Sequence, residues 1–158
     1  MKKVLVINGP NLNMLGIREK SIYGSDTLDS INAEIKNYAE TLDITCDFFQ
    51  SNCEGEIISK IHTVLTDYDG CVINAGAYTH YSYAIRDAIS CVSKPFIEVH
   101  MSDIKAREEF RHISVITDVC KEMIANILRI IGGNRVEILK IDDIIRVLSR
   151  ICGRLDSL

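Results

Sequence analysis

The chain of 158 residues has no long apolar run, and this absence argues against a membrane-spanning protein. Its first apolar run, VLVI, follows two lysines and stops at Asn8 and Gly9. The run is too short for the apolar region of a signal peptide, and a spanning helix needs about 20 apolar residues. We therefore expect a cytoplasmic protein that has no membrane partner.

An excess of basic residues is also missing. The chain has 18 lysines and arginines against 22 aspartates and glutamates, which gives a formal net charge of -4. Its basic residues are scattered and form no stripe, so we expect no nucleic-acid partner. An anionic ligand must therefore be held by a local positive site, because the overall field does not attract it.

The sequence contains neither a CxxC pair nor a short metal-binding histidine motif. Six cysteines could form disulfides, but Cys46, Cys71 and Cys120 lie inside apolar runs. That setting favours reduced cysteines that serve as small core residues, as in cytosolic proteins. His62 and His112 match neither HExxH nor HxH spacing, so we expect no metal site.

Linkers, internal repeats and low-complexity segments are absent as well. A domain of about 150 residues buries roughly 68 to 70% of the surface that its unfolded chain exposes, so this length can support a core without disulfides. We predict a single domain over residues 1–158.

Apolar runs of strand length alternate with helical patterns along the first hundred residues. The runs are KVLVIN (3–8), ITCDFFQ (44–50), GCVIN (70–74) and PFIEVH (95–100). Helical spacing follows the capping residues 25–27 and recurs over 57–65 and 84–92. Alternating strands and helices predict an α/β fold, a doubly wound parallel sheet with helices on both faces.

The carboxyl ends of parallel strands meet at one edge of such a sheet, which is where these folds bind ligands. The loops after Asn8, Asn74 and Val99 should therefore lie together.

The last fifty residues are harder to interpret, and part of them allows two interpretations. Apolar residues over 119–131 suit a helix, while the string MIANILRII could equally be a buried strand, and periodicity alone does not decide. Residues 136–155 carry apolar residues interleaved with arginines, which predicts a terminal amphipathic helix.

The loop within residues 4–24 sets Asn11, Arg18 and Tyr23 directly after the first predicted strand. A phenol titrates near pH ~10, and lowering its pKa by about 2 units requires roughly 2.7 kcal/mol. A guanidinium at about 4 Å supplies about 4 kcal/mol at an effective dielectric constant of ~20, before desolvation is subtracted. Arg18 could thus make Tyr23 a base. The alternative is a tyrosine that closes the loop while its arginine points to solvent.

Glu98 and His100 are two residues apart on one predicted strand, so both side chains leave the same face. A carboxylate in that position can orient or charge an imidazole, which suits an acid catalyst. The alternative is a strand-end histidine with a structural hydrogen bond.

The strings NGPNLN, FFQSN.EGE, VIN.GAYTH, RDA, EVH.S and ARE.FRH occur together in this chain. By them the sequence resembles the type II 3-dehydroquinate dehydratases from Val4 to about Asp118. The resemblance implies a flavodoxin-like fold with five parallel strands in a three-layer αβα sandwich. It also implies dehydration of 3-dehydroquinate to 3-dehydroshikimate in the shikimate pathway, which leads to chorismate and the aromatic amino acids. No metal or organic cofactor is implied, and the expected assembly is a homo-oligomer, a dodecamer built from trimers.

By this resemblance, Tyr23 removes a C2 proton and His100 protonates the C1 hydroxyl, which leaves as water after an enolate intermediate. Arg18 stabilises the transition state, Glu98 orients His100, and Asn11 orients a water near the enolate oxygen. Read from its residues alone, Asn11 could equally be a turn asparagine beside Gly9 and Pro10.

The resemblance also implies residues that bind the substrate. The carboxylate site of the family is matched by Asn74, Ser102 and the backbone of Met101. The site for the ring hydroxyls is matched by His80 and Arg111. Asp87 matches a residue that reaches the site of a neighbouring subunit. Arg107 matches a basic residue of a mobile loop, although a solvated loop arginine is an equal alternative.

Two other classes compete with this interpretation. The first is a flavodoxin-like signalling or FMN-binding module. Against a signalling module, Asn8 and Asn74 stand where a phosphoacceptor module has acidic residues. Against an FMN-binding module, the loop GPNLNMLG offers no hydroxyl group to bind a phosphate. Another lyase or hydrolase at the same edge stays open, because a fold does not fix a function. Lys94 shows no apolar pocket for a Schiff base, the chemistry of the unrelated type I dehydratase.

The sequence also departs from the family pattern. Lys20 stands where the family usually has a proline, and MIANIL lacks the glycines of the family's fifth strand. We therefore expect a divergent segment from about residue 119.

Overall fold

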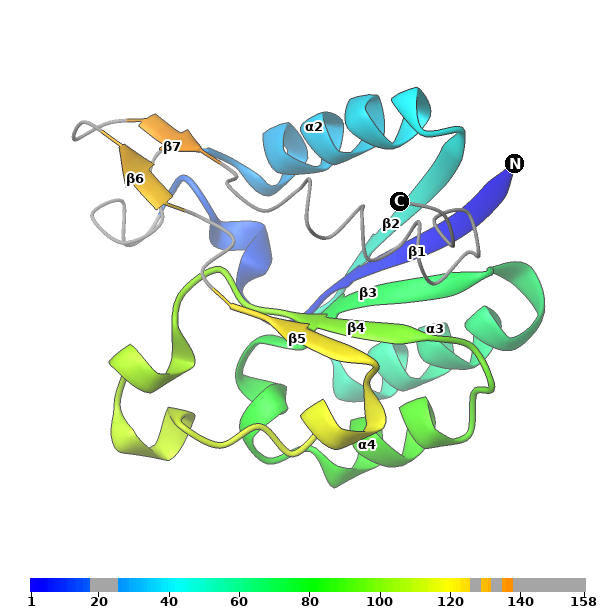
Figure 1. Cartoon of the computed structure of the whole chain (residues 1–158). Coiled ribbons are helices and arrows are strands. Elements are labelled where there is room, and N and C mark those ends of the chain that lie inside the picture. The colour runs from blue at the N-terminus through cyan, green and yellow to red at the C-terminus, as the bar shows by residue number, and fades with distance from the viewer. Residues whose placement is uncertain (18–25, 126–128, 132–134, 138–158) are drawn as a thin grey trace.

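The computed structural model describes residues 1–17, 26–125, 129–131 and 135–137 (Figure 1). Its centre is a five-stranded, all-parallel sheet with the strand order β2-β1-β3-β4-β5. The strands are β1 (Lys2–Asn8), β2 (Ile44–Gln50), β3 (Gly70–Asn74), β4 (Phe96–Val99) and β5 (Glu122–Ile124). The predicted α/β class and the parallel sheet are confirmed.

Helices cover both faces of the sheet, as predicted (Figure 1). Helix α2 (Leu28–Thr41) lies on one face, and helices α3 (Glu54–Asp67) and α4 (Tyr83–Ser90) lie on the other. The result is a three-layer αβα sandwich.

Alternation along β1 builds the two halves of the core. Val4 and Val6 pack in the cluster that includes α2, whereas Leu5 and Ile7 pack in the cluster that includes α3 and α4. Successive side chains of a strand point to opposite faces, so a strand that is apolar at every position must be covered on both sides. The continuous apolar runs in the sequence therefore reflect strands buried between two helical layers.

Two of the helices begin at hydroxyl caps. The Thr27 side chain accepts a hydrogen bond from the Ser30 backbone N–H at 3.1 Å, and the Ser82 side chain accepts one from the Ile85 N–H at 2.9 Å. Such caps satisfy donors that the first helical turn leaves open.

The C-terminal third resolves the open choice between helix and strand. Residues Glu122–Ile124 form β5, which extends the sheet beside β4 with Val99 paired to Ile124. Strands β6 (Arg129–Ile131) and β7 (Arg135–Glu137) pair in an antiparallel two-stranded sheet. The helix interpretation of 119–131 is therefore wrong at β5 and β6, because strand pairing, of β5 with β4 and of β6 with β7, outweighs helical periodicity.

The predicted terminal helix over 136–155 is also wrong at its start, since β7 includes residues 136 and 137. Backbone pairing with β6 competes there with the amphipathic pattern. Residues 138–155 lie outside the described part of the chain.

The loops after the strands do share the carboxyl edge. Asn8 pairs with Asn74 at the ends of β1 and β3, and the Gly9 N–H donates to the Asn74 carbonyl at 2.7 Å. A Cβ atom on Gly9 would lie 2.5 Å from the Ala75 carbonyl oxygen. Only glycine allows the two loops to approach so closely.

Two composition-based expectations can be compared with the described residues. Cys46 and Cys71 are buried, and all five cysteines of the described ranges are unpaired. None of the helices in the described part of the chain combines the length and the apolar character needed to cross a membrane.

Candidate active site

A cavity opens at the carboxyl edge of the sheet, between the loops that follow β1, β3 and β4. Eight of the predicted site residues line it, namely Asn11, Asn74, His80, His100, Met101, Ser102, Arg107 and Arg111. These residues are spread over a hundred positions of the sequence, and the crossovers of the parallel sheet bring them to one place. The structure thus brings together the predicted residues that it describes, apart from Glu98, which lies behind His100, and Asp87.

Glu98 and His100 form a buried pair at the end of β4. The Nε2 atom of His100 lies 2.7 Å from Oε1 of Glu98, and the relative exposures are 6% for His100 and 0% for Glu98. The predicted shared face of the two side chains is confirmed. Because the carboxylate engages Nε2, the ring nitrogen left for the cavity is Nδ1.

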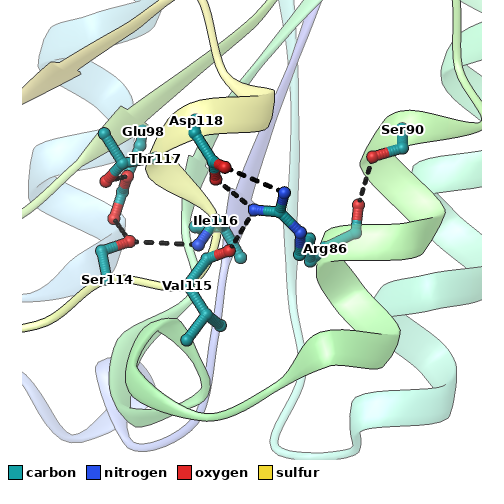
Figure 2. A network of polar contacts seen from close by, with 8 residues as sticks. All are labelled: Arg86, Ser90, Glu98, Ser114, Val115, Ile116, Thr117 and Asp118. Carbon is teal, nitrogen blue, oxygen red and sulfur yellow. Dashed lines mark hydrogen bonds and ion pairs between the residues drawn. The ribbon is translucent and has the colours of Figure 1, made fainter.

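Two hydroxyl groups complete the surroundings of Glu98 (Figure 2). The Ser114 hydroxyl donates to Oε1 at 2.7 Å, and the Thr117 hydroxyl donates to Oε2. Burial by itself raises the pKa of Glu98, but the hydrogen bonds from His100, Thr117 and Ser114 outweigh it and hold the pKa below its ordinary value. Glu98 is therefore a carboxylate that stays charged in the interior.

His80 reaches the cavity from the short 3₁₀ segment η2 (Gly76–His80). Its Nδ1 lies 2.7 Å from the Ile113 carbonyl oxygen, which can only accept, so Nδ1 carries the proton and Nε2 is left for a ligand. Burial lowers the pKa of His80, and the charge of Arg111 lowers it further against the opposing effect of the Ile113 bond. His80 is thus set up as a neutral imidazole.

Asn11 adopts a left-handed conformation with a φ of 66° at the turn after β1. Its backbone N–H donates to the Asn52 side-chain oxygen at 2.9 Å, and Gln50 Nε2 donates to the same oxygen at 3.2 Å. The loop after β2 therefore fixes the loop that carries Asn11. Asparagine tolerates this backbone conformation better than most residues, which fits its place at the turn.

The Asn74 side chain is buried at the end of β3. Its Oδ1 accepts from the Gly76 N–H at 3.2 Å, which directs the amide nitrogen, a donor, toward the cavity. Gly76 itself has a φ of 58°. A Cβ atom added at this position would lie 3.2 Å from the Pro10 carbonyl oxygen. Glycine thus permits the turn that presents this amide.

Two arginines supply the local positive charge that an anionic ligand requires in an acidic protein. Arg111 Nε donates to Glu108 at 2.9 Å, and Arg107 Nε lies 3.5 Å from the same carboxylate. Arg107 Nη1 also donates to the Ser102 hydroxyl at 3.4 Å. Glu108 therefore spaces and partly neutralises the two guanidinium groups at the cavity wall.

The described ranges contain no cluster of three histidine, cysteine, aspartate or glutamate side chains arranged to hold a metal ion. The polar groups that line the cavity include the amides of Asn11 and Asn74, the Ser102 hydroxyl, two guanidiniums and two imidazoles. This set suits an anionic, hydroxyl-bearing ligand and proton transfer at His100.

The model of the family described as dehydroquinase class II matches residues 2–129. The chain belongs to the class II dehydroquinase family. It is therefore an enzyme, a type II dehydratase by family. The matched range contains the whole cavity described above and reaches beyond Asp118, where the resemblance found from the motif strings ends.

Relatives named 3-dehydroquinate dehydratase are closely similar to this class II dehydroquinase. The protein of Caldicellulosiruptor bescii is 60% identical over 126 residues, which cover 79% of this chain and 87% of the relative. The protein of Bacillus cereus strain AH187 is 56% identical over 120 residues, 76% of this chain and 82% of the relative.

Two solved structures extend the similarity to the fold. The type II dehydroquinase from Butyrivibrio crossotus matches with a TM-score of 0.81 and 46% identity over 96% of this chain and 97% of that one. The type II dehydroquinase from Propionibacterium acnes matches with a TM-score of 0.83 and 37% identity, covering 95% and 97%. Together with the observed sheet, these neighbours confirm the predicted flavodoxin-like architecture.

Among the predicted residues of the dehydroquinase site that the structure describes, Glu98 and Asp87 do not line the cavity. Arg18 and Tyr23 lie outside the described residues, so their roles stay predictions. Asp87 is exposed on α4 and does not line the cavity.

Ser114, Thr117 and Glu108 support the site but were not among the predicted residues. The two hydroxyls contact a carboxylate 16 and 19 positions earlier in the chain, and no motif links such distant residues. The pattern RE at 107–108 with Arg111 three residues after Glu108 did carry a signal, because charges at that spacing often pair.

Proposed function

We propose that this chain dehydrates 3-dehydroquinate to 3-dehydroshikimate, a step of the shikimate pathway. The supporting observation is the buried Glu98–His100 pair, which faces a cavity lined by donors and by two arginines. Family membership and the names of the relatives support the same substrate. A buried carboxylate that holds an imidazole at a ligand cavity is an arrangement suited to acid catalysis.

In the proposed reaction, Tyr23 takes a proton from C2 of the substrate while Arg18 keeps the phenol ionised. The electron pair of the C2–H bond moves into an enolate, whose oxygen is stabilised by a water that Asn11 orients. The enolate then expels the C1 hydroxyl as His100 protonates it, so water leaves and a C1–C2 double bond forms. The proton gained by Tyr23 and the proton lost by His100 balance over one turnover.

The cavity supports a division of the binding roles. Asn74, Ser102 and the Met101 backbone are proposed to hold the substrate carboxylate, because they present donors along the end of the sheet. His80 and Arg111 are proposed to hold the ring hydroxyls, and the Nε2 of His80 is suited to this as an acceptor. Arg107, bonded to Ser102, is proposed to close over the carboxylate side.

We further propose a cytoplasmic homo-oligomer, a dodecamer built from trimers, in which Asp87 completes the site of a neighbouring subunit. The exposed position of Asp87 on α4, away from its own cavity, supports this role. Residues 1–158 are proposed to form one dehydratase domain that diverges from about residue 119. Sedimentation at assay concentration tests the assembly, and a fully active monomer would contradict it.

Incubation of the protein with 3-dehydroquinate tests the function, because the product is a conjugated enone whose absorbance can be followed directly. We expect turnover that neither a chelator nor borohydride added with the substrate abolishes, since no metal and no Schiff-base lysine takes part. Absence of product, or irreversible inactivation by borohydride that depends on substrate, would overturn the proposal.

A further inference from the structure

We propose that Thr117 and Ser114 are positioning residues that hold the Glu98 carboxylate in place for His100, a role that rests on the proposed dehydration. They are not proposed to touch the substrate, and neither lines the cavity. The inference concerns how His100, the proposed acid, is kept paired with a charged carboxylate and held in its orientation.

The two carboxylate oxygens of Glu98 accept hydrogen bonds from different donors. Oε1 accepts from both His100 Nε2 and the Ser114 hydroxyl, each at 2.7 Å. Among the described residues, the Thr117 hydroxyl is the one donor that reaches Oε2. With the carboxylate fully buried, no water replaces a lost donor without rearrangement, so Thr117 fixes the rotation of the carboxylate plane.

The direction of the Ser114 hydroxyl is also set. Its oxygen accepts from the Ile116 backbone N–H at 3.2 Å, so its own hydrogen is free to point at Glu98. The backbone of the segment thus orients one of the two hydroxyls before a substrate arrives.

Residues 114–118, which we call the hydroxyl segment, are clamped to the rest of the protein (Figure 2). Arg86 of α4 donates to the Val115 carbonyl at 2.8 Å and pairs through both Nη atoms with Asp118. The Val115 N–H donates to the Thr79 carbonyl at 2.9 Å, and Ile116 is completely buried. The hydroxyls therefore stand on a fixed segment, as preorganised support requires.

Removal of the Thr117 hydroxyl should raise the pKa of Glu98. An Oε2 without a partner in a dry environment disfavours the charged carboxylate and raises its tendency to protonate. The titratable groups that face Glu98 are His100, His80 and the Cys120 thiol, whose own pKa burial raises to about 12. The single N–H of neutral His80 is already donated to the Ile113 carbonyl, and a thiol is only a weak donor, so neither group offers an equivalent hydrogen bond.

The test compares Thr117→Val, which removes the hydroxyl at nearly constant shape, with Thr117→Ser, which keeps it. Thr79→Val is a control for the same loss of a hydroxyl, because Thr79 is buried, more so than the half-buried Thr117, and its hydroxyl has no partner among the described residues. We expect Thr117→Val to lower kcat about tenfold or more, with little change in KM, and to move the acidic limb of the kcat–pH profile to higher pH. Thr117→Ser should restore most of the loss, and Thr79→Val should behave like the parent.

A folded Thr117→Val variant with parental kcat and pH profile would overturn the inference, as would an equal change in Thr79→Val or no rescue by serine. If Thr117→Val fails to fold, Ser114→Ala with the same two readouts decides the question in the same way. A parent that forms no product from 3-dehydroquinate would instead overturn the proposed function, and the inference with it.

Discussion

The Nε2 atom of His100 lies 2.7 Å from the Oε1 atom of Glu98. This contact occupies Nε2 of a side chain that lines the cavity, and it leaves Nδ1 as the ring nitrogen without a partner among the described residues. Because both groups are buried, the pairing sets the tautomer and the orientation of the imidazole before a substrate binds. An acid catalyst held in this way needs no rearrangement at the moment of proton transfer.

Replacement of Glu98 by glutamine should remove the charge while keeping the shape. In Glu98→Gln the NH₂ group can face the Thr117 hydroxyl while the oxygen still accepts from His100, but a neutral amide then replaces the carboxylate and is a weaker acceptor for the imidazole. We expect kcat to fall by about 100-fold with a smaller change in KM. Steady-state kinetics measures this, and circular dichroism serves as the control for folding. Turnover within a factor of about two of the parent would contradict the role of Glu98.

The low pKa of Glu98 predicts a pH dependence of stability. Since the folded protein binds this proton more weakly than the unfolded chain, the hydrogen bonds of Glu98 stabilise the fold fully above its ordinary pKa of 4.5. That contribution is lost as the pH falls through the lower folded-state pKa. The free energy of unfolding of the parent, measured with urea, should therefore fall steeply below about pH 4.5. The difference in this free energy between the parent and Glu98→Gln should shrink over the same range.

The other carboxylates titrate equally in both proteins and cancel in that comparison. A stability difference between the parent and Glu98→Gln that is the same at about pH 6 and well below pH ~4 would show that Glu98 is not stabilised as a carboxylate.

Gly9 provides a test of the close approach between the loops after β1 and β3. An added methyl group would meet the Ala75 carbonyl oxygen at 2.5 Å, so Gly9→Ala should destabilise the protein by about 1 to 3 kcal/mol and should lower activity. Gly55→Ala is the matched control, because a Cβ there meets nothing within 4 Å. On helix α3 the alanine should be neutral or stabilising by about 0.5 kcal/mol. Equal unfolding midpoints for the two variants would be the contrary result.

The sequence was sufficient to predict strands β1 to β4, because each is a largely apolar run of strand length bounded by polar or turn residues. It could not decide the nature of Glu122–Ile124. That stretch fits both helix and strand patterns, and its conformation depends on pairing with β4, a contact that local sequence does not contain.

The residues of the candidate site likewise include some that could be placed from the sequence and some that could not. Asn11, Asn74 and His100 could be placed together in advance, because each follows or ends a parallel strand and all such ends share one edge. Ser114 and Thr117 could not, because they reach Glu98 through a segment whose path is fixed by Arg86 and by backbone contacts. Ordinary hydroxyls in an apolar stretch carry no sign of such a role.

The most direct test of the proposed chemistry is the turnover of Tyr23→Phe, Arg18→Gln and the double variant, measured beside the parent with 3-dehydroquinate. If Tyr23 is the base and Arg18 activates it, each single variant should retain its fold by circular dichroism and lose kcat by orders of magnitude. Because both residues act on one proton transfer, the double variant should be little worse than Tyr23→Phe alone. Near-parental turnover by Tyr23→Phe would contradict the account and assign the base to His100 or another group.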